Sequence, residues 1–300
     1  MRIAVIDIGT NSTRYLLADA GPGGRISRVE TLLKTTRLGE GMGRRLLTER
    51  AMARTTAAVA EFWRRAQSKG AEKILVAATC AVREAANRED FVRLVQQATG
   101  LEMRVLSERE EACYTFYGVL TGFEVPEADL EKIAVVDVGG GSTELVWMED
   151  GNLNASSLPL GAVRLTEQGE GIAVASLLRP VCRLIAGRRI FGTGGTITTL
   201  AAVAQGLAVY DPGRVHGYQL TAEKVTGLLA RLARLSLEER KKVPGLQPER
   251  ADVIVAGTRI VAELLECTGA SGITVSECDI LYGVAAEAAS PVERKSARNL

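Results

Sequence analysis

Two short stretches carry the residues best suited to chemistry, and they repeat one another. The first is Val5–Thr13 (VIDIGTNST), and the second, 130 residues later and aligned without a gap, is Val135–Thr143 (VVDVGGGST). In each, a β-branched apolar run ends in an aspartate, Asp7 or Asp137, followed by a glycine-containing turn and a second apolar run. This pattern predicts a strand–turn–strand hairpin with an acidic residue at the end of its first strand.

The turns of these hairpins could bind phosphate. Glycine lets the backbone approach a ligand closely, and outward-facing backbone N–H groups bind anions. One such turn alone would favour a plain hairpin, but two copies in one register favour two similar halves whose turns line a shared cleft. The residues predicted to bind phosphate here are Gly9, Thr10, Asn11, Ser12, Gly139, Gly140, Gly141, Ser142 and Thr143.

A third glycine turn, Phe191–Thr196 (FGTGGT), follows a short predicted strand and opens a helix. One interpretation is a plain strand-to-helix turn that Thr196 caps. The other is an anion site at the helix N-terminus, where free N–H groups and the helix dipole favour phosphate. Beside two similar turns we favour the anion site, with Gly194, Gly195 and Thr196 as its ligands.

Two carboxylates of the second hairpin could hold a divalent cation. A carboxylate at the end of an apolar strand is unexpected without a partner, and Glu144 returns the chain to the position of Asp137. Hard cations such as Mg²⁺ prefer oxygen ligands. Alternatively, each aspartate accepts N–H bonds from its own turn. We favour the metal for Asp137, whereas for Asp7 the two interpretations are balanced.

Other candidates have strong structural alternatives. Ser107–Glu110 predicts a helix-capping box, which leaves the next residue, Glu111, without a structural task; by default it is a surface glutamate. Arg83 and Arg164 could each clamp a phosphate, although arginines are common on surfaces. His216 fits a hydrogen-bonded loop histidine better than a catalyst.

The composition limits the class of protein. Three hundred residues, 46% hydrophobic and 24% charged, predict two globular domains, and a net charge of +1 argues against a nucleic-acid or membrane binder. Basic clusters such as Arg188–Arg189 are usually solvated, or could line a track for a polyanion. Five scattered cysteines without a CxxC pair support neither a zinc site nor a disulfide framework, and we expect a cytoplasmic protein. We find no targeting or membrane-spanning stretch.

The elements that must position these groups follow the order βββαβαβα twice. This order predicts an α/β fold with a mixed sheet in each half. The polar stretch after Thr121 gives the boundary, so domain I is expected over 1–123 and domain II over 124–282. A last helix over about 283–300 is expected to pack back onto domain I.

Together these motifs resemble the exopolyphosphatase/guanosine pentaphosphate phosphohydrolase (Ppx/GppA) family, of the sugar kinase, Hsp70 and actin superfamily. Asp7–Ser12 and Asp137–Glu144 (DVGGGSTE) are similar to its two phosphate loops, and Ala78–Ala85 is similar to its arginine-bearing segment. Ser107–Ala112 is similar to its SGxEEA segment, with Glu108 where glycine is usual. The resemblance runs to about residue 285, and the length matches the short two-domain exopolyphosphatase type.

The resemblance implies two similar actin-like (ribonuclease H-like) domains with mixed five-stranded sheets, flanking helices and a cleft between them. It implies that Glu111 is the catalytic base and that Arg83 contacts phosphate. The metal site would hold Mg²⁺ (or Mn²⁺) on Asp137 and Glu144, with Asp7 as a further metal residue, and a monovalent cation such as K⁺ is a further expectation.

The implied activity is hydrolysis of the terminal phosphate of linear inorganic polyphosphate by a cytoplasmic homodimer, without nucleic acid or membrane. Hydrolysis of guanosine pentaphosphate (pppGpp), the nucleotide of the stringent response, is the alternative, because both substrates present a terminal phosphoanhydride. A small-molecule kinase or an actin-like nucleotide-binding module is a more distant alternative.

Overall fold

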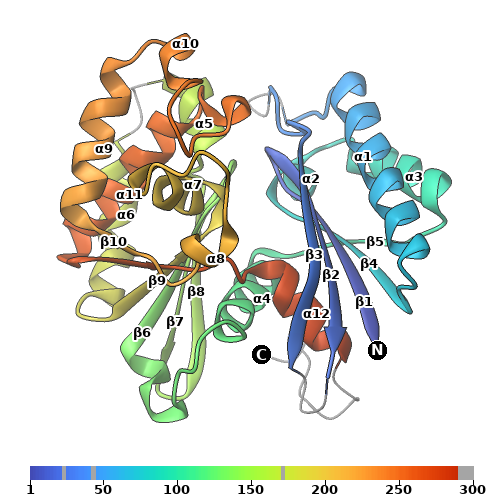
Figure 1. Cartoon of the computed structure of the whole chain (residues 1–300), viewed down its shortest axis with the longest axis horizontal. Coiled ribbons are helices and arrows are strands. Elements are labelled where there is room, and N and C mark those ends of the chain that lie inside the picture. The colour runs from blue at the N-terminus through green and yellow to red at the C-terminus, as the bar shows by residue number, and fades with distance from the viewer. Residues whose placement is uncertain (22–24, 42–44, 170–172, 290–300) are drawn as a thin grey trace. The chain divides into compact units, whose positions relative to one another are not determined.

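The structure, a computed structural model, describes residues 1–21, 25–41, 45–169 and 173–289. The chain forms two compact units. Unit 1 comprises Met1–Thr121 together with the chain from Asp279 onward, and unit 2 comprises Gly122–Cys278 (Figure 1). The predicted boundaries lay after residues 123 and 282. In the described ranges, no helix combines the length and hydropathy that a membrane span requires.

Unit 1 contains a mixed five-stranded sheet with the strand order β3-β2-β1-β4-β5. Its strands are β1 (Arg2–Ile8), β2 (Ser12–Ala20), β3 (Ile26–Thr35), β4 (Lys73–Ala78) and β5 (Met103–Val105). β1 pairs antiparallel with β2 and parallel with β4. The helices are α1 (Glu49–Ser68), α2 (Cys80–Glu84), α3 (Arg88–Thr99), α4 (Glu108–Leu120) and α12 (Ile280–Ala289). The helix predicted over about 283–300 is α12, and residues 290–300 lie outside the described part of the chain.

Strand β1 is buried on both faces, which places the aspartate near its end in the interior. Ala4, Ile6 and Ile8 belong to a core that also contains Met52 and Phe62 of α1. Because successive side chains of a strand point to opposite faces, Asp7 lies on the other face. Helix α12 packs against the sheet, and α4 packs against α12.

Unit 2 contains a mixed six-stranded sheet with the order β10-β11-β9-β6-β7-β8. Its strands are β6 (Ile133–Val138), β7 (Thr143–Glu149), β8 (Asn152–Leu158), β9 (Arg189–Thr193), β10 (Gln219–Thr221) and β11 (Gly272–Val275). Its helices include α5 (Ala162–Gln168), α6 (Val174–Ile185), α7 (Gly194–Ala204), α8 (Pro212–Val215), α9 (Ala222–Arg234), α10 (Leu237–Arg240) and α11 (Ile254–Thr268). The core lies between the sheet and these helices and contains Val136, Leu145 and Ile197.

The mixed α/β fold with flanking helices is confirmed in both units. The prediction of five strands holds for unit 1 and is wrong for unit 2, where β10 is a sixth strand. β10 has only three residues, which is too short to show an alternating pattern, and its last residue, Thr221, is also the N-cap of α9.

Candidate active site

The two repeated turns have the same geometry. In each, the first glycine amide donates to a serine carbonyl three residues later, Gly9 to Ser12 and Gly139 to Ser142, both at 3.0 Å. A Cβ added at either glycine would lie 3.2 Å from that same carbonyl oxygen. The repeat in the sequence is therefore also a repeat in structure.

The first turn, in unit 1, uses its carbonyl groups and leaves its amides available. The carbonyls of Thr10 and Asn11 accept hydrogen bonds from the amides of Gly39 and Arg37 at 2.9 and 2.8 Å. In the part of the chain that the structure describes, the amides of Thr10 and Asn11 donate to no other group. Adjacent unbonded amides of this kind are suited to an anion.

The second turn, in unit 2, is arranged in the same way. The carbonyls of Gly139 and Gly140 accept bonds from the first amides of α5, and that of Gly141 accepts the Arg164 Nε at 2.7 Å. Among the described residues, the amides of Gly140 and Gly141 have no acceptor. Arg164 thus supports the turn from its carbonyl side.

The segment before α5 packs tightly against this second turn. A Cβ added at Gly161 would overlap the backbone of Gly140. The hydroxyl of Thr143, predicted to bind phosphate, donates to the carbonyl of Leu160 at 2.5 Å. That hydroxyl therefore fixes the turn, whose amides are left for a ligand.

Four polar side chains form one row across the sheet of unit 2. Thr193 is paired with Asp137, Asp137 with Glu144, and Glu144 with Ser157, each on the neighbouring strand. Residues directly opposite one another share a face, so the two carboxylates lie side by side, although like charges in this arrangement repel. Glu144 is 2% exposed, and Ser157 Oγ donates to its Oε1 at 3.0 Å.

The third turn joins this row. Gly194 has φ +87°, and a Cβ there would overlap Oδ1 of Asp137. A Cβ at Gly195 would overlap the guanidinium of Arg250, a residue only 9% exposed. The interpretation of Thr196 as the cap is wrong: the N-cap is Thr193, and it makes no side-chain cap bond. Thr196 is the third residue of α7, and its side chain fills the space beside Gly257 of α11.

In unit 1, Glu111 lies in the first turn of α4 and is 9% exposed. The predicted capping box of Ser107 and Glu110 is confirmed. Arg83, on α2, donates through Nη1 to Glu111 Oε2 at 2.6 Å and to the Leu106 carbonyl at 3.0 Å. Burial raises the pKa of Glu111 to about 7, against the opposing effect of the Arg83 charge. A carboxyl with this pKa can exchange a proton near neutral pH.

Asp7 is also buried, and only one of its oxygens is bonded. Arg14 donates to Asp7 Oδ2 through Nε at 3.0 Å and Nη2 at 2.6 Å. Asp7 Oδ1 is buried and has no hydrogen-bond partner among the residues that the structure describes. Burial raises the pKa of Asp7, the Arg14 charge lowers it, and the nearby Asp279 raises it further. The Asp7 charge also raises the pKa of Glu111, so the two carboxyls of unit 1 are electrostatically linked.

Sequence reasoning missed four of these groups: Arg14, Ser157, Arg250 and Asp279. Ser157 could have been found by counting back along both strands from the Asp150-Gly151 turn, which fixes the register of β7 and β8. Nothing local in the sequence signals Arg14 or Asp279, which are 265 residues apart. The predicted acid and metal ligands fall in both units, with Asp7 and Glu111 in unit 1 and Asp137 and Glu144 in unit 2, and the shared cleft stays a prediction.

His216 has the structural role expected for it. Its ring stacks on Phe123 with 4.4 Å between centroids. Its Nδ1 accepts the Glu277 amide at 3.2 Å, so Nε2 carries the hydrogen that bonds the Gly122 carbonyl at 2.9 Å. Both ring nitrogens are thus used within unit 2.

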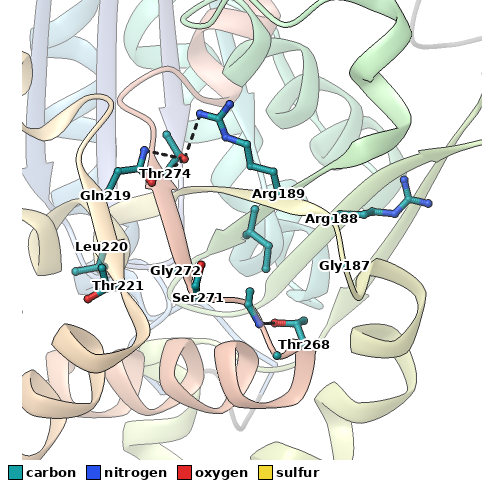
Figure 2. Close-up of a pocket in the computed structure, with 13 residues that line it drawn as sticks. Gly187, Arg188, Arg189, Gln219, Leu220, Thr221, Thr268, Ser271, Gly272 and Thr274 are labelled. Carbon is teal, nitrogen blue, oxygen red and sulfur yellow. Dashed lines mark hydrogen bonds between the residues drawn. The ribbon is translucent and has the colours of Figure 1, made fainter.

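A polar cavity of about 460 Å³ lies at the opposite end of β9 from the third turn (Figure 2). Arg188 and Arg189 line it. Arg188 donates to the Met148 carbonyl at 2.9 Å, and the Arg189 guanidinium lies 4.6 Å from the centre of the Phe191 ring. Both arginines are thus engaged by the protein, and the described lining contains none of the predicted phosphate or metal residues.

The chain is similar to known phosphatases along nearly its whole length. The Ppx/GppA phosphatase family matches residues 16–288. Exopolyphosphatase 2 of Mycobacterium tuberculosis is 34% identical over 315 residues, covering 95% of this chain and 97% of the relative. The crystal structure of the Aquifex aeolicus Ppx/GppA family member has a TM-score of 0.79 at 30% identity, covering 96% of this chain and 97% of that one.

An exopolyphosphatase structure from Cytophaga hutchinsonii has a TM-score of 0.86 at 22% identity, covering 96% of this chain and 98% of that one, which shows a shared fold. The family match spans nearly the whole chain and the whole second hairpin, and it begins within β2, after the first strand and turn of the first hairpin. The chain therefore belongs to the Ppx/GppA phosphatase family and is a phosphoanhydride hydrolase.

Proposed function

We propose that this protein removes the terminal phosphate from linear inorganic polyphosphate. The observation that carries the proposal is Glu111, a buried carboxylate with a pKa near 7, held by Arg83 in a unit that also carries a turn with available amides. A general base works best when its pKa lies near the working pH. The similarity to an exopolyphosphatase along nearly the whole chain supports polyphosphate as the substrate.

Binding would rest on backbone amides and guanidinium groups. The unbonded amides of Thr10, Asn11, Gly140 and Gly141 suit phosphate oxygens. In the described part of the chain no side chain caps the first amides of α7, and the buried Arg250 guanidinium lies beside them. Because the groups of each unit are held in place by that unit's own backbone contacts, they need little reorganisation within the unit to stabilise the charge of the transition state.

We propose Mg²⁺ (or Mn²⁺) as the metal, held by Asp137 and Glu144. These two carboxylates stand side by side on one face, and a divalent cation between them would relieve their repulsion. The described residues contain no group of three or more metal-ligating side chains. That fits Mg²⁺, which usually takes one or two carboxylates and keeps several waters and phosphate oxygens as further ligands. When bound, the ion would neutralise charge on the transferred phosphoryl group.

In the chemical step, Glu111 accepts a proton from the attacking water. The water oxygen forms a bond to the terminal phosphorus while the bond to the bridging oxygen breaks, and the shortened chain leaves with that electron pair. Arg83 orients the carboxylate through Oε2. Phosphoryl transfer has a loose transition state, so positioning and electrostatics supply most of the acceleration.

The deciding experiment measures phosphate release from long-chain polyphosphate and from pppGpp side by side, at equal concentrations of terminal phosphate. We expect faster turnover of polyphosphate and loss of that activity in Glu111→Gln. Release from pppGpp alone would establish the nucleotide as the substrate instead. Release from neither would overturn the proposal, and acceptor-dependent formation of ADP from ATP would indicate a kinase.

A further inference from the structure

Arg14 lies between two buried carboxylates of unit 1. On one side it donates twice to Asp7 Oδ2, and on the other its Nη1 donates to Asp279 Oδ2. Asp7 is 3% exposed and Asp279 is 5% exposed. A guanidinium fixed from two sides in this way has little freedom to rotate.

The repeated hairpins show how unusual this arrangement is within the chain. Arg14 is paired with Asp7 at the position where, in unit 2, Glu144 is paired with Asp137. Unit 2 thus places two carboxylates side by side, whereas unit 1 places a permanent cation beside its aspartate. The cation in unit 1 is the Arg14 guanidinium, a side chain rather than a bound ion, and it is held by Asp279, 265 residues away in the sequence.

Asp279 performs two tasks at once. Its Oδ1 accepts the Leu281 amide at 2.9 Å, which caps the N-terminus of α12, while its Oδ2 holds Arg14. The same residue lies against α4, because a Cβ added at Gly118 would overlap the Asp279 carbonyl. Asp279 therefore joins the helix that carries Glu111 to the hairpin that carries Asp7.

We propose that Asp279 is a positioning residue: it holds Arg14 against Asp7 Oδ2 and so leaves Asp7 Oδ1, among the residues that the structure describes, as a buried acceptor without a donor beside the glycine turn. A buried carboxylate oxygen without a donor is costly and is suited to a group that arrives with the substrate, here the second hydrogen of the attacking water. This role rests on the proposed phosphohydrolase function.

The test is a double-mutant cycle between Arg14 and Asp279. Asp279→Asn keeps the helix cap, since asparagine caps as well as aspartate, but removes the charge that holds Arg14. We expect about a tenfold lower kcat on polyphosphate, as for the loss of other orienting partners, with KM nearly unchanged. In the Arg14→Gln background, Asp279→Asn should have no further effect on kcat. Asp211→Asn is the matched control, because Asp211 caps the short helix α8 in unit 2 and should leave kcat unchanged.

The role of Asp279 would be overturned if Asp279→Asn lowered kcat by the same factor in the wild-type and Arg14→Gln proteins. A kcat for Asp279→Asn within a factor of two of wild type would overturn it as well. Circular dichroism and melting temperature show whether each variant is folded. If the wild type hydrolyses neither polyphosphate nor pppGpp, the proposed function is wrong. The same double-mutant cycle, measured by melting temperature, then tests whether Asp279 holds Arg14. Additive effects on melting temperature would reject it.

Discussion

Glu111 is subject to two opposing influences, burial, which favours its neutral form, and the Arg83 guanidinium, which favours its charge. As a base it acts only when ionised, so kcat should rise with pH and level off above about 7.

Glu111→Gln should lower kcat by about 10²–10⁴-fold, the usual contribution of a general base. Glu108→Gln, an exposed position in the same helical turn, is the control and should change kcat little. A folded Glu111→Gln variant with near-normal turnover would remove Glu111 from the mechanism.

The same carboxyl makes stability depend on pH. Its folded-state pKa of about 7 lies above the ordinary value of 4.5, so its stabilising contribution is full below pH 4.5 and is lost as pH rises through 7. The shift corresponds to a free energy on the order of 3 kcal/mol. Relative to wild type, Glu111→Gln should therefore gain stability between pH 4.5 and pH 8. Urea unfolding of both proteins at the two pH values measures this, and a pH-independent difference would contradict it.

Ser157 orients Glu144 without carrying charge itself. Loss of an orienting partner of a metal ligand typically costs about 10–100-fold in metal affinity or activity. Ser157→Ala should therefore raise the Mg²⁺ concentration needed for half-maximal activity by about tenfold. Ser156→Ala, the neighbouring residue whose side chain points to the other face of β8, is the matched control. Equal Mg²⁺ dependence in both variants would show that Ser157 does not orient a metal ligand.

At the scale of elements, the sequence predicts the two hairpins and the N-terminus of α4 because the residues that determine them are close together in the chain. The two-residue turn Asp150-Gly151, with φ +50° and +72°, fixes the register that brings Glu144 opposite Ser157. The capping box is likewise readable within four residues. The environment of Glu111 was not predictable in this way, because its burial depends on how other elements pack around it. Local signals gave a surface glutamate, and only the family resemblance indicated a base.

The crossing of α4 and α12 depends on two glycines. A Cβ added at Gly283 would overlap the Tyr114 carbonyl, and one added at Gly118 would overlap that of Asp279. Gly283→Ala should therefore destabilise the protein by about 1–3 kcal/mol, the usual cost of overpacking. Gly227→Ala, in α9 with open space around it, should instead stabilise it by about 0.5–1 kcal/mol. Thermal unfolding of both variants checks the contrast, and equal shifts would refute the close approach.

At the scale of the whole molecule, unit 1 is discontinuous in sequence whereas unit 2 is continuous. Contacts between the ends of unit 1 include Arg14 with Asp279 and the Tyr114 hydroxyl with Glu287 Oε2 at 2.6 Å. Such pairings join residues that are far apart in the sequence, so the hydrophobic periodicity of a short window cannot predict them. The packing of a last helix back onto the first domain was nevertheless among the predictions made from the sequence.

This difference in continuity predicts how fragments behave. A fragment of residues 122–278 contains its whole sheet and core and should unfold cooperatively on heating. A fragment of residues 1–121 lacks α12, whose Ile280, Leu281 and Val284 are buried, and should leave one face of its sheet exposed and unfold without a sharp transition. Joining residues 279–289 to it through a short Gly/Ser linker should restore the transition. Circular dichroism melts of the three fragments decide this, and a sharp transition for residues 1–121 alone would show that α12 is dispensable for unit 1.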